Sequence, residues 1–296
     1  MDKGNEKRDF CTCWWLMFLT MACVLVLSTV IGGMVVNENN YYITSFFAEL
    51  SIFLPVFWGY VMLKKRNEEN GIGVKKFPVR LIPYLVILPI VAQPFINMLT
   101  IPLTNLTEFL FGIEDVVTVT PGNWSEWIFA ILTLCVVAPI VEEFLCRGIM
   151  MQYAKNYGVV VALVTTSVVF AMLHFSPSSF VILFFLGFLI GVVRIITDSI
   201  WACVLMHSVN NLVAFFLGII SETADVLYIV LLVLAIVLFP LTLYLFLKKT
   251  PSENREKIIY KPIKQKGFSA GMLLCFLTYG IYSILLMAIN LTEKFA

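Results

Sequence analysis

The sequence predicts an all-α integral membrane protein, a polytopic bundle of about eight or nine transmembrane helices. Of its 296 residues, 60% are hydrophobic and only 13% are charged, and the mean hydropathy is +0.93. A typical soluble domain has about 25% charged residues. One bilayer crossing takes about 20 apolar residues, so nine crossings leave only short loops. We therefore expect a single membrane domain over residues 1–296.

Nine apolar runs follow one another along the chain, and each is long enough to form a transmembrane helix. The first run follows three basic residues, as in a signal peptide. It is too long for one and lacks a small-residue cleavage site, so we expect it to remain as the first helix. The predicted spans are 12–35, 42–63, 81–102, 127–150, 158–175, 179–196, 200–220, 225–247 and 268–290.

The basic residues predict the orientation of the bundle. If the N-terminus is cytoplasmic, the inner side collects 19 of the 20 Lys and Arg residues. The positive-inside rule therefore favours a cytoplasmic N-terminus and an outer C-terminus. In a bacterium the membrane would be the plasma membrane. The basic loops at 64–80 and 248–267 are interpreted as topology signals, with docking to anionic lipid as the alternative.

Charge and cysteine content exclude several classes of protein. The formal net charge is +1, without the concentrated basic footprint that nucleic-acid binding requires. The seven cysteines lie mostly in apolar runs, with no CxxC pair and no metal-type spacing, so we expect buried small hydrophobic residues. The expected partners are the lipid bilayer and a membrane-associated peptide or protein substrate, with no nucleic acid.

The fourth span contains ionisable residues at membrane depth, where charge is costly and commonly functional. Glu143 and Arg147 are four residues apart, the spacing and order that favour an ion pair within one helix. Glu142 lies about 100° around the helix and has no partner there. It must be neutral, pair with another helix or face water. Pro139 removes one backbone hydrogen bond and frees the carbonyl of Cys135.

The only two histidines of the sequence lie on later spans. His174 ends the pattern Phe170-x-x-x-His174 in the fifth span, and His207 lies one turn before Asn211 in the seventh. With a rise of about 1.5 Å per residue, these side chains reach depths similar to that of Glu142. They can form one site if the three helices adjoin.

Three motifs on these spans resemble the signature of the CPBP family, which comprises CAAX prenyl endopeptidases and bacterial bacteriocin-processing and immunity-associated intramembrane proteases. The similarity covers about 70 residues and uses both histidines. It implies a catalytic core at 127–220, flanked by further transmembrane helices at 1–126 and 221–296. The motifs are Glu142-Glu143-x-x-x-Arg147, Phe170-x-x-x-His174 and His207-x-x-x-Asn211.

The resemblance implies a glutamate-dependent intramembrane endopeptidase without a covalent acyl-enzyme, without a cofactor and without an obligatory metal. Glu142 would be the general base that holds and activates a water together with His174. His207 and Asn211 would donate hydrogen bonds to the tetrahedral oxyanion, since imidazole and amide N–H groups suit developing negative charge. Glu143 and Arg147 would form a supporting ion pair.

Other proteolytic chemistries remain open. HExxH and GxSxG motifs are absent. Two histidines and a carboxylate from Glu142 or Glu143 could still bind zinc, which a chelator would reveal. Cys203 lies one turn before His207 and could form a nucleophilic pair with it, in which case Cys203→Ser would abolish activity.

Three further ionisable residues are interpreted as interfacial. Arg194 and Asp198, one turn apart at the end of the sixth span, are expected to be a snorkelling pair at the membrane surface. Glu49 is expected at the interface near the start of the second span. Its alternative is a residue behind the site or along the substrate path.

Two functions of other classes remain as alternatives. Buried ionisable residues on neighbouring helices also describe a proton-coupled transporter, although no duplicated half carries a matching polar cluster. A non-catalytic peptide-binding, immunity or regulatory membrane protein would have a similar cavity lining. The founding branch of the family cleaves prenylated CAAX peptides. A bacterial relative would be expected to cut a leader peptide, a pheromone precursor or a membrane-anchored regulator.

Overall fold

The computed structural model describes residues 3–35, 41–111, 120–250 and 269–295. Within these ranges all regular secondary structure is helical, as the sequence predicts. Seven helices are long and apolar enough to cross a membrane, and two shorter apolar stretches, Cys11–Leu27 and Val159–Leu173, accompany them. Each of the nine predicted spans overlaps one of these helical segments. The predicted basic loop 248–267 lies outside the described residues from residue 251 onward.

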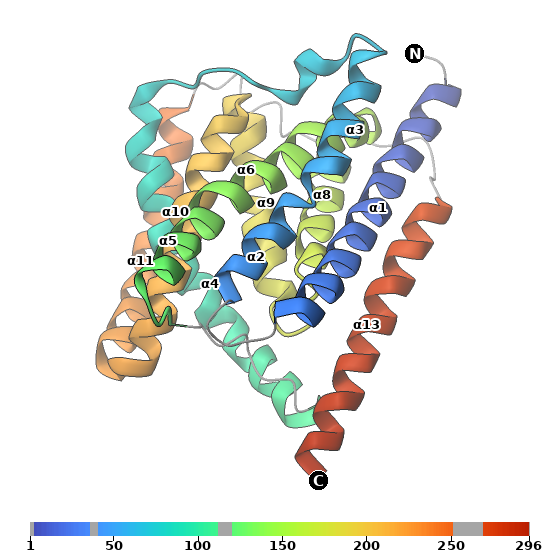
Figure 1. The fold of residues 1–296 in the computed structure, drawn as a ribbon. Helices are drawn as coiled ribbons and strands as arrows, with labels where there is room; N and C mark the ends of the chain where they lie inside the picture. The colour runs from blue at the N-terminus through green and yellow to red at the C-terminus, as the bar shows by residue number, and fades with distance from the viewer. Residues whose placement is uncertain (1–2, 36–40, 112–119, 251–268, 296) are drawn as a thin grey trace.

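Seven spans consist of one helix each, and they lie side by side in a bundle (Figure 1). The N-terminal and C-terminal helices pack against each other at one edge of this bundle. The single-helix spans are α1 (Lys3–Val35), α4 (Ile82–Phe111), α8 (Val159–Leu173), α9 (Phe180–Thr197), α10 (Ile200–Thr223), α11 (Asp225–Lys249) and α13 (Ala270–Phe295).

The second span is broken into α2 (Tyr41–Leu50) and α3 (Phe53–Lys64), where the sequence predicted one continuous helix. Pro55 explains the break, because it has no N–H group and its ring excludes the carbonyl of Ser51 from a regular helix. The chain tightens before it: the Ser51 N–H donates to the Ala48 carbonyl at 3.0 Å, and the Ile52 N–H to the Glu49 carbonyl at 3.1 Å. Glu49 therefore lies at the break.

The fourth span runs without interruption but contains two wide π-helical turns. It comprises α5 (Trp124–Leu132), η4 (Thr133–Val137), α6 (Ala138–Glu143), η5 (Phe144–Met150) and α7 (Met151–Ala154). The Ala138 N–H reaches back five residues to the Thr133 carbonyl, next to Pro139, which cannot donate. The Met151 N–H likewise reaches Cys146. Such π turns are frequent at functional sites, and these two flank the adjacent glutamates.

Helices α8 and α9 approach closely through the small-residue pattern Gly187-x-x-x-Gly191. A methyl group at Gly187 would come within 3.1 Å of Arg147 Nη2 and 3.2 Å of the Phe170 ring. One at Gly191 would come within 2.8 Å of Leu163. Glycine at these positions lets the two backbones pack around the Arg147 side chain.

The segment between α3 and α4, which includes η2 (Glu69–Ile72) and η3 (Val79–Leu81), is fixed to the junction of α9 and α10. Arg194 donates to Asp198 at 2.8 Å and to the Gly71 carbonyl at 2.9 Å, and Lys75 lies 2.6 Å from Asp198. The Arg194 side chain is only 7% exposed. The expectation of a snorkelling pair was therefore wrong for Arg194, which is buried under this segment.

Two helices at the periphery expose almost entirely apolar surface. In the most apolar windows of α11 and α13, only 6% and 11% of the residues are buried. Their hydropathies of 3.0 and 2.2 are far above what an aqueous surface sustains. The acyl chains of a bilayer match this surface, and the chain is an integral membrane protein.

Candidate active site

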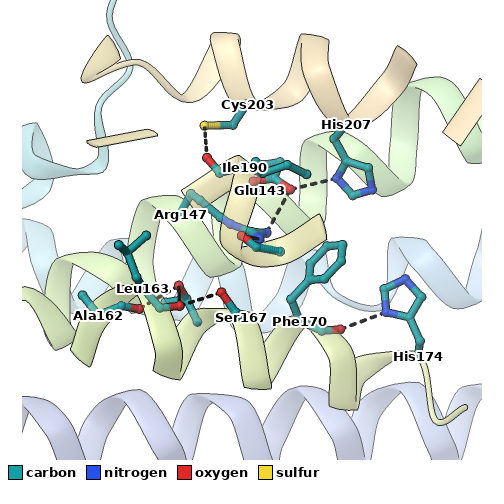
Figure 2. A network of polar contacts seen from close by, with 12 residues as sticks. Glu143, Arg147, Ala162, Leu163, Ser167, Phe170, His174, Ile190, Cys203 and His207 are labelled. Carbon is teal, nitrogen blue, oxygen red and sulfur yellow. Dashed lines mark hydrogen bonds and ion pairs between the residues drawn. The ribbon is translucent and has the colours of Figure 1, made fainter. Parts of the chain in front are cut away.

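The site is organised around Glu143, a fully buried carboxylate at the end of α6. One of its oxygens accepts hydrogen bonds from Arg147 Nη1 at 3.0 Å and from His207 Nδ1 at 2.8 Å. The contact with Arg147 is the ion pair that the spacing within the helix predicts. The contact with His207 joins residues 64 positions apart and was not predicted. Figure 2 shows these side chains meeting between α10 and the fourth span.

Arg147 is fully buried, and its two terminal nitrogens have different partners, while its Nε has none among the described residues. Nη2 donates to the carbonyl of Gly187 on α9 at 2.7 Å, and the guanidinium carbon lies 4.6 Å from the centre of the Phe170 ring. A buried charge is tolerated only when it is paired and hydrogen-bonded. Arg147 therefore links the fourth span to α8 and α9 and is not free to contact a substrate.

The ring of Phe170 on α8 lies between the two histidines. Its centre is 5.0 Å from that of His174 and 5.4 Å from that of His207 (Figure 2). The Phe170 carbonyl accepts a hydrogen bond from His174 Nδ1 at 2.9 Å. Because a carbonyl only accepts, Nδ1 carries the hydrogen, and Nε2 of the neutral ring is a free acceptor.

His174 itself lies at the end of α8 and is exposed. The next residue, Phe175, has a left-handed backbone with φ of 48°, which ends the helix. The imidazole is thus held by its backbone contact on one side and open on the other. This geometry suits a base that must reach a water or a substrate.

The hydrogen bond to Glu143 also fixes the tautomer of His207. An ionised carboxylate only accepts, so Nδ1 of His207 carries the hydrogen. Nε2 is then an acceptor in the neutral ring and becomes a donor only in the imidazolium.

The other two predicted site residues are Glu142, in α6 between the two π turns, and Asn211, on α10. Glu142 is 4% exposed and has no hydrogen bond or ion pair within the described part of the chain; its Oε2 is buried without a partner. Asn211 Nδ2 donates to the Leu134 carbonyl in η4 at 2.9 Å. The structure has no hydrogen bond between Glu142 and His174 among the described residues.

Sequence reasoning misplaced one carboxylate. Glu49 does not lie at the membrane surface, because its Oε2 is buried without a partner and its carboxylate interacts electrostatically with Glu142. The signal was present in the sequence, since Glu49 is the sole charged residue of its predicted span. Two further residues were missed: Gly187, and Asn210, which is 2% exposed with an unpartnered Oδ1.

The alternative chemistries find little geometric support. No group of three His, Cys, Asp or Glu residues in the described part of the chain is placed to hold a metal ion. The Cys203 thiol contacts the carbonyls of Ile190 and Ser199, at 3.7 and 3.5 Å, and its sulfur is fully buried. A thiol in this position is a packing group in the core.

Comparison with known proteins agrees with the motifs. Residues 124–213, 90 of the 296, match the family model described as type II CAAX prenyl endopeptidase Rce1-like. Searches of curated proteins and of solved structures found no match. The matched segment begins at the first residue of α5 and ends two residues after Asn211, so it contains all three motifs. The chain therefore carries a segment, residues 124–213, that is similar to the Rce1-like type II CAAX prenyl endopeptidases, which are peptide hydrolases.

Proposed function

We propose that this membrane protein hydrolyses a peptide bond of a membrane-associated peptide or protein with a water activated by Glu142 and His174. The observation that carries the proposal is the buried carboxylate of Glu142, which has no hydrogen bond or ion pair within the described part of the chain, whereas the adjacent Glu143 is paired with Arg147. A carboxylate that no protein group neutralises is available to accept a proton from water.

In the proposed reaction, Glu142 takes a proton from the water as the water oxygen attacks the carbonyl carbon of the substrate. His174 orients the water through Nε2, which its contact with Phe170 leaves free. The new oxyanion accepts hydrogen bonds from Asn211 Nδ2 and from Nε2 of the imidazolium form of His207. Glu142 then returns the proton to the leaving nitrogen, and the C–N bond breaks.

Glu143 and Arg147 have a supporting role in this scheme. The Glu143 carboxylate accepts the hydrogen bond from Nδ1 of His207 and so holds the ring that donates to the oxyanion, and Arg147 pairs with the same carboxylate oxygen. No cofactor or metal takes part in the proposed steps, and a chelator should leave turnover unchanged.

The substrate is expected to approach through the bilayer. We propose a leader peptide, a precursor peptide or a membrane-anchored regulator as the substrate class, and the lipid bilayer as the one obligatory partner. We also propose that the N-terminus is cytoplasmic, as the basic residues indicate, and, for a bacterial chain, that the membrane is the plasma membrane.

The test compares the small peptides released from membranes that contain the wild-type chain or Glu142→Gln at matched expression. A matched control is Glu126→Gln, which removes another buried glutamate of the same span, one that is 2% exposed and lies outside the motifs. Peptides should appear with the wild type and the control and be lost with Glu142→Gln. If all three samples agree, the chain acts by binding or transport and the proposal is wrong.

A further inference from the structure

We propose that Glu49 and Glu142 share one proton, and that Glu49 is thereby the positioning residue that sets the protonation state of the water-activating carboxylate. The inference about catalysis rests on the role proposed above for Glu142. The sharing of the proton itself rests on the structure of the two helices that carry these residues.

The first observation is the arrangement of α2 against the fourth span. α2 packs on α5, η4 and α6, and Glu49 lies at its C-terminal end, where Pro55 breaks the helix. Glu49 Oε2 and Glu142 Oε2 are both buried, and neither has a hydrogen-bond partner. If one of the two carboxyls carries a hydrogen, a hydrogen bond between them gives both buried oxygens a partner.

The second observation is that neither group has an ion pair with a cation in the part of the chain that the structure describes. Arg147 is committed to Glu143 and to the Gly187 carbonyl. His207 is committed through Nδ1 to Glu143. Two like charges that interact inside a protein disfavour double ionisation, so a pair of carboxylates on packed helices without a cation favours a state with one proton.

Other titratable side chains on the elements around α2 and α6 do not replace Glu142 as the neighbour of Glu49. Among the described residues, Glu142 is the one charged group found to interact electrostatically with Glu49. Among the side chains that the structure describes, the remaining titratable groups on these elements are Cys11, Cys13 and Cys23 of α1, Tyr41 and Tyr42 of α2, Glu126 of α5, Cys135 of η4, Glu143 of α6, Cys146 and Arg147 of η5, and Cys203 and His207 of α10.

The shared proton has a clear consequence for the reaction. With the hydrogen on Glu49, the Glu142 carboxylate is ionised and steadied by one hydrogen bond, and so it can accept a proton from water. Once it has done so, both carboxyls are protonated. Donation from Glu142 to the leaving nitrogen then restores the singly protonated pair, so the pair begins and ends each turnover in the same state.

The first experiment detects the proton without any substrate, so it remains informative even if the chain proves not to be a protease. Infrared spectra of the purified full chain in lipid nanodiscs at neutral pH are compared for the wild type and Glu49→Gln. We expect the carbonyl-stretch band of a protonated carboxylic acid to be lost in Glu49→Gln. We expect Glu142→Gln to shift that band, because the acid loses its hydrogen-bond acceptor, and Glu126→Gln to leave it in place.

Two spectroscopic results would overturn the proposal. The first concerns the difference spectrum of the wild type minus Glu49→Gln. If it contains a carboxylate band and no acid band, Glu49 is ionised. An acid band that Glu142→Gln leaves unmoved would mean that Glu49 is protonated independently and shares nothing with Glu142.

The second experiment measures kcat/KM against pH. Glu49→Leu removes the hydrogen-bond donor to the Glu142 carboxylate, so the acid limb should move to higher pH by about one unit, a tenfold loss at pH values below the limb. Glu49→Gln keeps an N–H donor and should restore most of the shift. Identical pH profiles for all three proteins, or a shift to lower pH in Glu49→Leu, would refute the positioning role. Loss of all activity in a folded Glu49→Gln would instead make Glu49 itself catalytic.

Discussion

Replacement of Arg147 by methionine should destabilise the protein strongly, because it leaves the Glu143 carboxylate buried without its cation. Both side chains are 0% exposed and their charged atoms are 3.0 Å apart. At an effective dielectric constant of about 20, unit charges about 4 Å apart attract by about 4 kcal/mol. Removal of one partner of a buried pair typically costs about 3–5 kcal/mol. We expect a loss of that size in the free energy of unfolding.

The double variant Glu143→Gln/Arg147→Met separates this electrostatic cost from lost packing. It removes both charges, while the amide oxygen can still accept from His207, so it should be more stable than Arg147→Met alone. The coupling between the two sites should be about 1–3 kcal/mol. Reversible unfolding in mixed micelles, followed by tryptophan fluorescence, measures each free energy.

Lys75→Met supplies the matched control for removal of a cation. Its ion pair with Asp198 is as short, at 2.6 Å, but the two side chains are 58% and 49% exposed. An exposed pair of this kind contributes about 0–1 kcal/mol. The reasoning about the buried pair would be refuted if the double variant lost as much stability as Glu143→Gln and Arg147→Met lose together. It would also be refuted if Arg147→Met cost no more than Lys75→Met.

Four further predictions concern other parts of the molecule. Gly187→Ala should lower thermal stability because the added methyl group meets Arg147 and two atoms of α8, whereas Gly280→Ala, with no atom within 4 Å, should not. Asn211→Ala should reduce peptide release about 10²- to 10³-fold, the usual effect of losing one oxyanion donor; near-normal release would remove it from the site. Cys203→Ser should retain turnover in the same assay, since the thiol only packs in the core. Partial burial favours a higher pKa for Asp198, but the hydrogen bonds and charges of its two basic partners outweigh it and lower the pKa. Its contribution to stability should therefore be complete above the usual aspartate range and disappear as pH falls through the lowered value, which acid titration of unfolding in wild type and Asp198→Asn would show.

The sequence alone determined the properties that depend on neighbouring residues of one helix. Nine apolar runs of membrane-spanning length predicted the spans, because burial in a bilayer requires both the composition and the length. The ion pair of Glu143 with Arg147 follows from their spacing of one helical turn. The order of the motifs was likewise sufficient to indicate the family that the match over residues 124–213 identifies.

Only the tertiary structure decided which side chains of different helices meet. Helical periodicity specifies a face of one helix, but the depth and rotation of its neighbour depend on close packing, here on Gly187 and on the π turns around α6. For that reason the bond from His207 to Glu143 and the burial of Glu49 Oε2 were not predictable from spacing. The span that holds Glu49 is interrupted between α2 and α3, and α2 packs on α6, so the carboxylate oxygen Oε2 that the sequence had suggested for the membrane surface is buried.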